Sequence, residues 1–180
     1  MKIIAIDPGN KKSAYVIWDG SMPVREIDIL DNYALREYLK CLGSEYCVVI
    51  EKVACMGMPV GEDVFETVYW TGRFCEAVEG RLAYFRVKRH EVKMHLCGST
   101  RAKDANIITA LVDRFDPERK FGKYGKGTIR APGFFHGFKA DVWQAAALAI
   151  YFYDEQHPCG GVGKRRENEN FVVKHLNTIR

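Results

Sequence analysis

Two short apolar segments constrain the fold of this chain more than any other feature of its sequence. Residues 2–7 (KIIAID) and residues 46–50 (YCVVI) are nearly continuous apolar runs rich in β-branched side chains. Such runs are typical of strands that are covered on both faces, as in α/β proteins. The first run ends in Asp7 before a Pro-Gly turn signal, and the second is followed by Glu51. We therefore expect two buried strands that each end in an acid.

The rest of the pattern completes a mixed α/β arrangement. Residues 13–18 and 24–29 are predicted to form an antiparallel meander with the first strand, and residues 82–87 a fifth strand. Helices are expected at about 32–41, 63–79, 90–96, 102–115 and 140–153, and residues 117–138 are expected to be irregular. Asp31 or Asn32 can cap the first helix. The apolar positions predicted to face the core are Leu35, Tyr38, Leu39 and Leu42 in that helix, and Val64, Val68, Phe74, Cys75 and Val78 in the second.

Composition indicates one domain. The chain has 180 residues and is 47% hydrophobic, which suffices for one sizeable core. We assign residues 1–155 to this domain and residues 156–180, which are polar, to a C-terminal tail. No apolar run approaches the roughly 18 residues of a membrane span, and the start of the chain does not resemble a signal peptide, so we expect a cytoplasmic protein. The six cysteines (41, 47, 55, 75, 97 and 159) lack zinc-site spacing and are expected to be reduced thiols.

Basic residues are concentrated in two segments, although the net charge is only +4. The stretch from Arg86 to Lys103 contains Glu91 as its only acid. The stretch from Arg119 to Ala140 has no acid, and its aromatic residues are Phe121, Tyr124, Phe134, Phe135 and Phe138. Its basic residues with a predicted role in DNA binding are Arg119, Lys120, Lys123, Lys126 and Arg130. Such clusters suit a polyanion, with aromatic rings available for stacking on bases, although a solvated basic loop has the same composition.

Three acids occupy positions that one site would need. Asp7 and Glu51 end two strands, and if these strands are parallel neighbours their side chains project from the same edge of the sheet. Asp141 opens the last helix, where the helix dipole stabilises a negative charge. Converging carboxylates need a cation, and hard oxygen ligands suit Mg²⁺ or Mn²⁺. Two such ions, about 3.5–4 Å apart, can activate a water and stabilise the leaving oxygen of a phosphodiester. Asp7 would bridge both ions, with Glu51 and Asp141 on either side.

Each acid also has an ordinary structural explanation. Asp7 could be a turn residue before Pro8, Glu51 could form a surface ion pair with Lys52, and Asp141 could simply cap its helix. The functional interpretation depends on all three falling where one site would need them.

Four segments, in order along the chain, resemble the motifs of RuvC-type Holliday junction resolvases. IAIDPG at 4–9 is similar to the first motif of that family, and VVIEKV at 48–53 to the second. Residues 92–107 (VKMHLCGSTRAKDANI) resemble its Val-Lys segment with the later glycine and helix start. Residues 139–152 (KADVWQAAALAIYF) resemble its final helix. The resemblance spans residues 4–152, and PGFFHGFKADVW is similar to a variant in phage-encoded members, which suggests a bacteriophage source.

This resemblance implies a ribonuclease H-like fold, with a five-stranded mixed sheet in the order 3-2-1-4-5 flanked by helices. It implies a homodimer that uses Mg²⁺ or Mn²⁺, two ions per site, to make symmetric nicks in four-way DNA junctions. The implied activity is that of a crossover junction endodeoxyribonuclease. Lys93 falls at a basic position of the family, where it could contact the scissile phosphate; a solvated helix lysine is the alternative. The helix at 63–79 is our expectation for the dimer interface.

The sequence departs from the family pattern in two places. Where the family has an acid or a histidine three residues before the last Asp, this chain has Phe138. His136 is the nearest candidate for a fourth metal ligand, with Gln144 as the choice if the register shifts by three. The family's Ala-Asp-Lys appears here with the last two residues exchanged, as Ala102, Lys103 and Asp104, so either Lys103 or Asp104 could serve the site. We assign Lys103 to DNA binding.

Three other functions fit parts of the sequence. A ribonuclease H or a nuclease with relaxed branch or flap specificity would share the fold and the acids. A module that binds branched DNA without cutting it would be consistent with the missing fourth acid. A sugar-kinase-like or actin-like ATPase also begins with an apolar strand ending in Asp and Gly, but it requires glycine-rich phosphate loops and roughly twice this length.

Overall fold

The strands form one mixed sheet. The computed structural model describes residues 1–21, 24, 26–54, 57 and 59–157. Its strands are β1 (Lys2–Asp7), β2 (Lys12–Trp18), β3 (Glu26–Asp31), β4 (Tyr46–Lys52) and β5 (Tyr84–Lys88). Their order is β3-β2-β1-β4-β5; β1 is antiparallel to β2 and parallel to β4, and β4 is parallel to β5. This is the predicted order 3-2-1-4-5. The two apolar runs, β1 and β4, are interior strands of the sheet.

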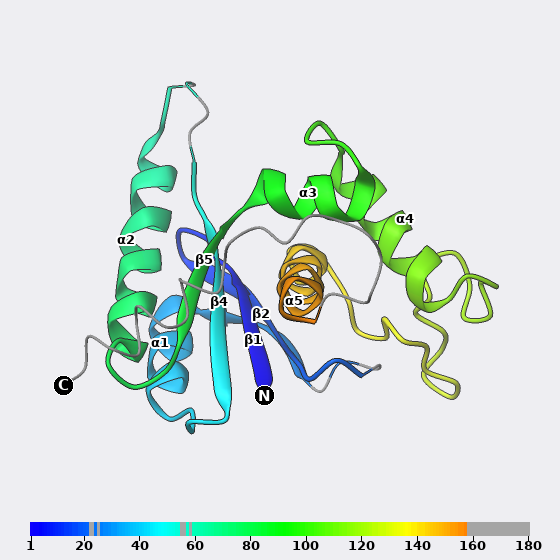
Figure 1. Cartoon of the computed structure of the whole chain (residues 1–180), viewed down its shortest axis with the longest axis horizontal. Coiled ribbons are helices and arrows are strands. Elements are labelled where there is room, and N and C mark those ends of the chain that lie inside the picture. The colour runs from blue at the N-terminus through cyan, green and yellow to red at the C-terminus, as the bar shows by residue number, and fades with distance from the viewer. Residues whose placement is uncertain (22–23, 25, 55–56, 58, 158–180) are drawn as a thin grey trace.

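Helices cover both faces of the sheet (Figure 1). α1 (Asn32–Lys40) and α2 (Glu62–Val78) lie on one face, and α3 (Arg89–Cys97), α4 (Asp104–Phe115) and α5 (Val142–Gln156) lie on the other. Asp31 is the cap of α1, since its carboxylate accepts a hydrogen bond from the Tyr33 amide at 2.9 Å. None of the described helices is long and apolar enough to cross a membrane.

Alternating strand residues divide the interior into two cores. Ile4, Ile6, Val48 and Ile50 pack with α1 and α2, whereas Ile3, Ala5, Cys47 and Val49 pack with the layer that contains α5. This is the period-2 alternation of strands covered on both faces. Residues 142–150 of α5 are all buried, because this helix lies between the sheet on one side and α3 and α4 on the other. Apart from Gln144, residues 142–150 are apolar, which suits a helix that is covered on both sides.

The core-facing side of α2 differs from the prediction. Phe74 and Val78 are buried as expected, and they are joined by Trp70 and Ala77. Val68 was predicted to face the core but is 47% exposed, and that prediction was wrong. The buried positions recur at intervals of three and four from residue 70, so the helical period places Val68 on the outer side of the helix. In α1, by contrast, the predicted core residues Leu35 and Leu39 are buried.

The basic segment between α4 and α5 is irregular, as predicted, but it is tied to the core. Its turns begin at the buried Asp116, whose carboxylate accepts hydrogen bonds from the amides of Lys120 and Phe121 at 2.8 and 3.0 Å. Phe135 and Phe138 are fully buried and pack against Trp143 of α5. These two rings are therefore unavailable for stacking on bases, which corrects the prediction for them.

Parts of the predicted tail and of the cysteine set lie outside the described residues. α5 continues to Gln156, and the tail from residue 158 onward is not among the residues described. The same holds for Cys55 and Cys159, whereas the other four cysteines are free thiols.

Candidate active site

Asp7 and Glu51 stand next to each other on the two central strands. Ile6 pairs with Ile50 in the parallel ladder between β1 and β4, and the following residue of each strand is the acid. Since side chains alternate along a strand, Asp7 and Glu51 continue the series of Ala5 and Val49. Both acids therefore belong to the face of the sheet that carries α3, α4 and α5, at its C-terminal edge.

The environment of Asp7 disfavours its negative charge. Burial raises the pKa of Asp7 well above its ordinary value, and the nearby charge of Glu51 raises it further. The guanidinium of Arg89 opposes this effect, while the carboxylates of Asp141 and Asp104 add to it. Asp7 therefore lies within electrostatic range of all three other acids. Such a convergence of carboxylates attracts cations.

Glu51 is held by an arginine that the sequence analysis did not assign to the site. The Glu51 side chain is only 15% exposed, and burial raises its pKa. Arg89 lowers that pKa, as does Lys93. Nη1 of Arg89 donates to both Glu51 carboxylate oxygens, at 3.2 and 3.4 Å, and its Nη2 donates to Asp104 at 2.9 Å. Glu51 of β4 thus pairs with Arg89 of α3. It does not form the surface ion pair with Lys52 that the sequence also allowed.

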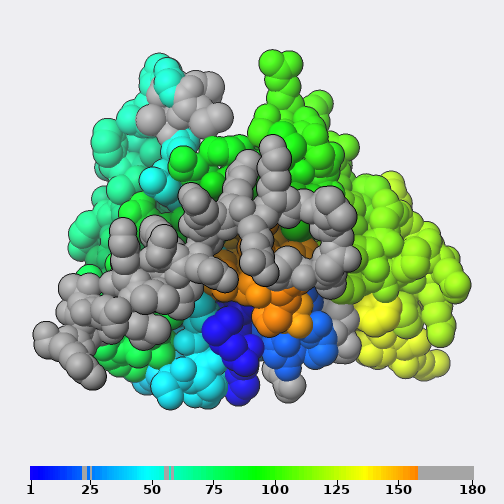
Figure 2. All heavy atoms as spheres, viewed as in Figure 1, coloured from blue at the N-terminus to red at the C-terminus, as the bar shows by residue number. Residues whose placement is uncertain are grey.

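An open cavity of about 400 Å³ adjoins these acids. The surface is hollowed between the atoms of α2 and those of α3 (Figure 2). Arg89 and Lys93 are four residues apart on α3, so they share the face that lines this cavity. The lining residues are Asp7, Pro8, Glu51, Lys52, Val53, Ala54, Val64, Thr67, Lys88, Arg89, His90, Lys93 and Thr100. The predicted catalytic Lys93 is thus placed beside two of the predicted acids.

Asp141 is at the start of α5, as predicted, but it does not act as a side-chain cap. Its exposed carboxylate makes no capping hydrogen bond to the helix. Its charge nevertheless contributes to the raised pKa of Asp7. The residue before it, Ala140, has a φ of 40°, in the left-handed region that non-glycine residues seldom adopt. Because the Asp141 carboxylate makes no hydrogen bond to the first turn of α5, the structure does not support a role as a side-chain helix cap.

The turn that follows Asp7 is held by a buried network. Nδ2 of Asn32 donates to the Gly9 carbonyl at 2.9 Å, and the Ser13 hydroxyl donates to Oδ1 of Asn32 at 2.7 Å. The Gly9 amide donates to the Ser13 hydroxyl at 3.2 Å, which closes the ring of contacts. Asn32 and Ser13 are buried, so these hydrogen bonds specify the path of the chain directly after Asp7. In the sequence Asn32 was considered only as a possible helix cap, because its burial and its contacts with Gly9 and Ser13 are not visible there.

The acids approach one another without forming a complete metal centre. Among the described residues, no three His, Cys, Asp or Glu side chains are gathered closely enough to hold a metal ion as they stand. The donor chemistry still suits a hard divalent cation, because carboxylate oxygens are the ligands such ions prefer. The charges of Glu51, Asp141 and Asp104 repel that of Asp7, and a bound cation would relieve this repulsion.

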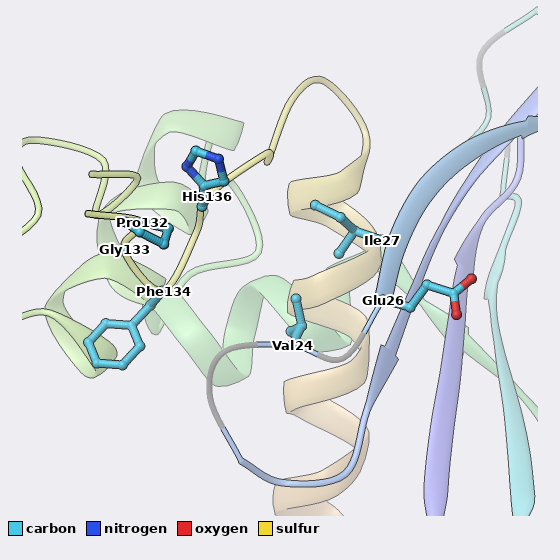
Figure 3. Close-up of a pocket in the computed structure, with 7 residues that line it drawn as sticks. All are labelled: Val24, Glu26, Ile27, Pro132, Gly133, Phe134 and His136. Atoms are coloured by element: carbon cyan, nitrogen blue, oxygen red, sulfur yellow. The ribbon is translucent and has the colours of Figure 1, made fainter. Parts of the chain in front are cut away.

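His136, the candidate for a fourth ligand, lies in a different cavity. That cavity, of about 230 Å³, is formed by His136 and its neighbours on the segment before α5 together with Val24, Glu26 and Ile27 (Figure 3). Nδ1 of His136 is 3.2 Å from the Lys126 carbonyl. The two cavities share no lining residue, so the structure does not bring His136 to Asp7 and Glu51. Asp104, which the sequence analysis left open, is the acid that Arg89 links to Glu51.

The predicted DNA-binding residues are on the surface but not in the cavity beside Asp7. The segment that carries most of them lies beyond the end of α4, on the side of α5 away from α2 (Figure 1). Exposed members are Lys103, Lys120, Lys123 and Arg130, whereas Arg119 and Lys126 are half-buried. Arg119 forms an ion pair with Asp113. Lys120 lies over the ring of Phe121 and Lys123 over that of Tyr124, so this segment interleaves charge with aromatic surface, as predicted.

Arg89 was missed because its role depends on the strand that precedes it. In the sequence Arg89 stood out only as one of the basic residues of the 86–103 segment. A signal was present, since Arg89 directly follows β5, and β5 is the parallel neighbour of β4. The C-terminal ends of parallel neighbours meet at one sheet edge, so the residue after β5 belongs with Asp7 and Glu51.

Comparisons with known proteins identify the fold. No protein-family profile matches this sequence, and no curated protein matches it. RuvC from Thermus thermophilus superposes with a TM-score of 0.61 at 14% identity, over 87% of this chain and 96% of that chain. T. thermophilus RuvC in complex with a Holliday junction substrate superposes with a TM-score of 0.57 at 11% identity, with the same coverage. The chain therefore has the ribonuclease H-like fold of RuvC, as the motif resemblance implied.

Proposed function

We propose that this chain is a metal-dependent, structure-selective DNA endonuclease that resolves four-way junctions by paired phosphodiester hydrolysis. The observation that supports this best is the pair of acids, Asp7 and Glu51, at the C-terminal edge of two parallel strands, opening into a cavity lined by Arg89 and Lys93. Metal-dependent phosphodiester hydrolysis uses acids to hold the metal ions, and basic side chains can bind the phosphates of the substrate. The fold is shared with RuvC, which has been solved with a Holliday junction substrate.

The proposed metal ligands are Asp7, Glu51 and Asp141. They would hold Mg²⁺ or Mn²⁺, with two ions per site, through carboxylate oxygens. When bound, such ions activate a water molecule and stabilise the leaving oxygen of a phosphodiester. The burial of Asp7 in the sheet keeps its carboxylate in one place, and the network of Asn32, Ser13 and Gly9 orients the turn behind it.

The basic residues are proposed to bind the DNA backbone. Lys93 faces the cavity from α3, where its ammonium group can contact the scissile phosphate. Lys103 and the exposed lysines of the 117–138 segment would contact phosphates farther from the cut, with the exposed Tyr124 available for stacking on a splayed base. These contacts predict binding that weakens steeply as salt rises.

A homodimer would supply the two sites that paired cleavage requires. The outer side of α2 carries three exposed apolar side chains, Phe65 (63% exposed), Val68 (47%) and Tyr69 (55%), next to the exposed Tyr33 of α1. The guanidinium of Arg73 lies over the rings of Tyr33 and Tyr69. A contiguous exposed apolar surface with aromatic and arginine side chains is typical of protein interfaces. We propose that a second copy of this chain binds to this surface. The cytoplasmic location and the bacteriophage source of the protein remain predictions.

The test is cleavage of an end-labelled four-way junction beside a linear duplex of the same arms. Each substrate is incubated with Mg²⁺, with Mn²⁺ or with EDTA, using the natural protein and Asp7→Asn. We expect paired nicks at the branch that require the metal and are lost in the variant. Tight junction binding without cleavage under any metal would replace the nuclease by a binding module. Equal cutting of flaps, forks or linear duplex would retain the chemistry and discard the junction specificity.

A further inference from the structure

Arg89 occupies the position of a cation between the acids of the proposed site. Its Nη1 contacts both oxygens of Glu51, and its Nη2 contacts Oδ1 of Asp104. Arg89 is the first residue of α3 and is 34% exposed, whereas Glu51 is 15% and Asp104 62% exposed. One guanidinium thus joins a largely buried carboxylate on the sheet to an exposed carboxylate at the start of α4.

These contacts use the atoms that a metal ion would need. A guanidinium has only donors, so it cannot coordinate a metal itself. Both Glu51 oxygens lie within hydrogen-bonding distance of Nη1, and a divalent cation bound to Glu51 has to compete with Arg89 for those lone pairs. Two cations in contact with one carboxylate also repel each other, so binding of the metal and the Arg89–Glu51 ion pair oppose each other.

We propose that Arg89 is an internal counter-ion that holds the carboxylates of the metal-free protein together and is exchanged for the metal ion at Glu51. The proposal rests on the metal-dependent function proposed above. The Nη2 arm on Asp104 is separate from the Nη1 arm on Glu51, so Arg89 can release Glu51 and remain attached to α4.

The exchange has two opposite consequences for a variant that lacks the guanidinium. Without metal, Glu51 and Asp7 lose the cation that offsets their burial, so the metal-free protein becomes less stable. With metal, no internal cation has to be displaced, so the ion binds more tightly. Tighter metal binding together with lower metal-free stability distinguishes a displaced counter-ion from a residue that merely supports the fold.

The test combines Mn²⁺ titration by calorimetry with thermal unfolding in EDTA and in Mn²⁺, without DNA and at constant ionic strength. For Arg89→Gln we expect the dissociation constant for Mn²⁺ to fall roughly fivefold or more, the size of a typical coupling between two linked sites. We also expect a lower Tm in EDTA and a larger rise in Tm on adding Mn²⁺. Arg89→Lys, which keeps the charge but cannot reach both acids as a fork, should lie between Arg89→Gln and the natural protein.

Two control variants separate this effect from general ones. Lys88→Gln removes an exposed positive charge from the same cavity. Arg36→Gln removes another arginine that bridges two acids, Glu37 and Glu76, in the layer of α1 and α2. Both should leave the dissociation constant for Mn²⁺ within about twofold, whatever they do to Tm.

Unchanged or weaker Mn²⁺ binding in both Arg89 variants would overturn the exchange while leaving the nuclease proposal intact, provided that the natural protein binds Mn²⁺ and cuts junctions. An equal tightening in Lys88→Gln would also overturn it, because a simple loss of charge would then explain the result. A natural protein that neither binds Mn²⁺ nor cuts DNA would overturn the proposed function and the exchange together. If Arg89→Gln does not fold, the comparison of Arg89→Lys with the natural protein decides.

Discussion

Asp7 and Glu51 lie side by side on two parallel strands, because Ile6 pairs with Ile50 and each acid is the next residue of its strand. The sheet therefore holds two partly buried carboxylates side by side, and burial raises the pKa of each. Without a metal ion this arrangement costs stability, and the metal ion proposed for this site would offset that cost. Carboxylates with pKa values raised in this way are often found at functional sites.

Asp7→Asn should abolish cleavage and stabilise the metal-free protein. If Asp7 holds the metal as proposed, its loss removes several kcal/mol of transition-state stabilisation, which corresponds to a drop in rate of about a thousandfold or more. The raised pKa of Asp7 means that its ionised form opposes folding at neutral pH. Removing that charge should therefore raise the Tm in EDTA, by about 2–4 °C for each kcal/mol gained.

The control for this variant is Asp28→Asn, which removes an exposed acid from β3. It should change neither the cleavage rate nor the Tm appreciably. A lower Tm for Asp7→Asn in EDTA would show that the ionised carboxylate supports the fold, contrary to this expectation.

Metal binding should release protons, and its affinity should rise with pH. A ligand carboxylate has to be ionised before it binds a metal, and burial together with Glu51 raises the pKa of Asp7 well above the usual range. Affinity for Mn²⁺ should therefore increase as pH rises through the pKa of Asp7 and level off above it. Calorimetric titrations at several pH values, in buffers of different ionisation enthalpy, measure both effects. Mn²⁺ affinity that is the same at every pH, with no proton release at any of them, would contradict the prediction.

Asn32→Ala should weaken both stability and cleavage. The substitution removes the donor to the half-buried Gly9 carbonyl and the acceptor of the buried Ser13 hydroxyl, and it leaves both groups without this partner. The expected cost is about 1–3 kcal/mol in the free energy of unfolding, measured in urea. The cleavage rate should fall even where the variant is fully folded, because the turn behind Asp7 loses its support. Asn106→Ala, at an exposed helix start, is the matched variant and should cost less and leave the rate unchanged.

Asp154→Asn should destabilise the layer formed by α3, α4 and α5. The Asp154 carboxylate accepts hydrogen bonds from Arg114 at 2.6 and 2.8 Å and lies 2.7 Å from Nε2 of His95. Burial raises the pKa of Asp154, but the hydrogen bonds from Arg114 and His95 outweigh it, so this pKa is lower than usual. At neutral pH the variant should lose about 1–2 kcal/mol, since the pair is partly exposed to solvent.

The pH dependence of that loss has a definite sign. A carboxylate whose pKa is lowered by folding contributes stability above its unfolded pKa of about 4, and this stability is lost as pH falls through the lower folded value. The difference between Asp154→Asn and the natural protein should therefore shrink in acid. Urea unfolding at neutral and acidic pH measures it, with the exposed neighbour Glu155→Gln as the control. A difference that is the same at both pH values would exclude the ion pairs as its source.

Phe65→Glu should dissociate the proposed dimer. A charge in place of Phe65 on the exposed apolar side of α2 would be desolvated at the interface, so the dimer dissociation constant should rise about tenfold or more. Sedimentation equilibrium of the natural protein and the variant measures this constant. Tyr124→Glu changes an exposed aromatic residue elsewhere and should leave it unaltered. A natural protein that is monomeric at all concentrations would refute the dimer.

Much of the fold followed from local pattern. The two apolar runs at 2–7 and 46–50 predicted β1 and β4 because a strand covered on both faces needs apolar residues at successive positions. Asp7 and Glu51 were placed correctly at the ends of those strands, since the position of an acid after an apolar run is visible in the sequence. The start of α5 at Asp141 was equally local, because the small and apolar residues that follow begin a buried helix there.

Contacts between distant segments were decided only by the tertiary structure. Its place after β5 could have put Arg89 at the acidic edge of the sheet, but its pairing with Glu51 and Asp104 depends on where β5 ends and α4 begins relative to β4. Phe135 and Phe138 looked like surface aromatics among basic residues, but packing against Trp143 buries them. His136 was close to Asp141 in sequence, yet it lines a cavity with Val24 and Ile27 and not the cavity that Asp7 and Glu51 share, because the path of an irregular segment is set by its packing. Sequence determined which residues could form strands, helices and an acidic edge; packing determined which charges meet there, because electrostatic contacts depend on distances in space and not along the chain.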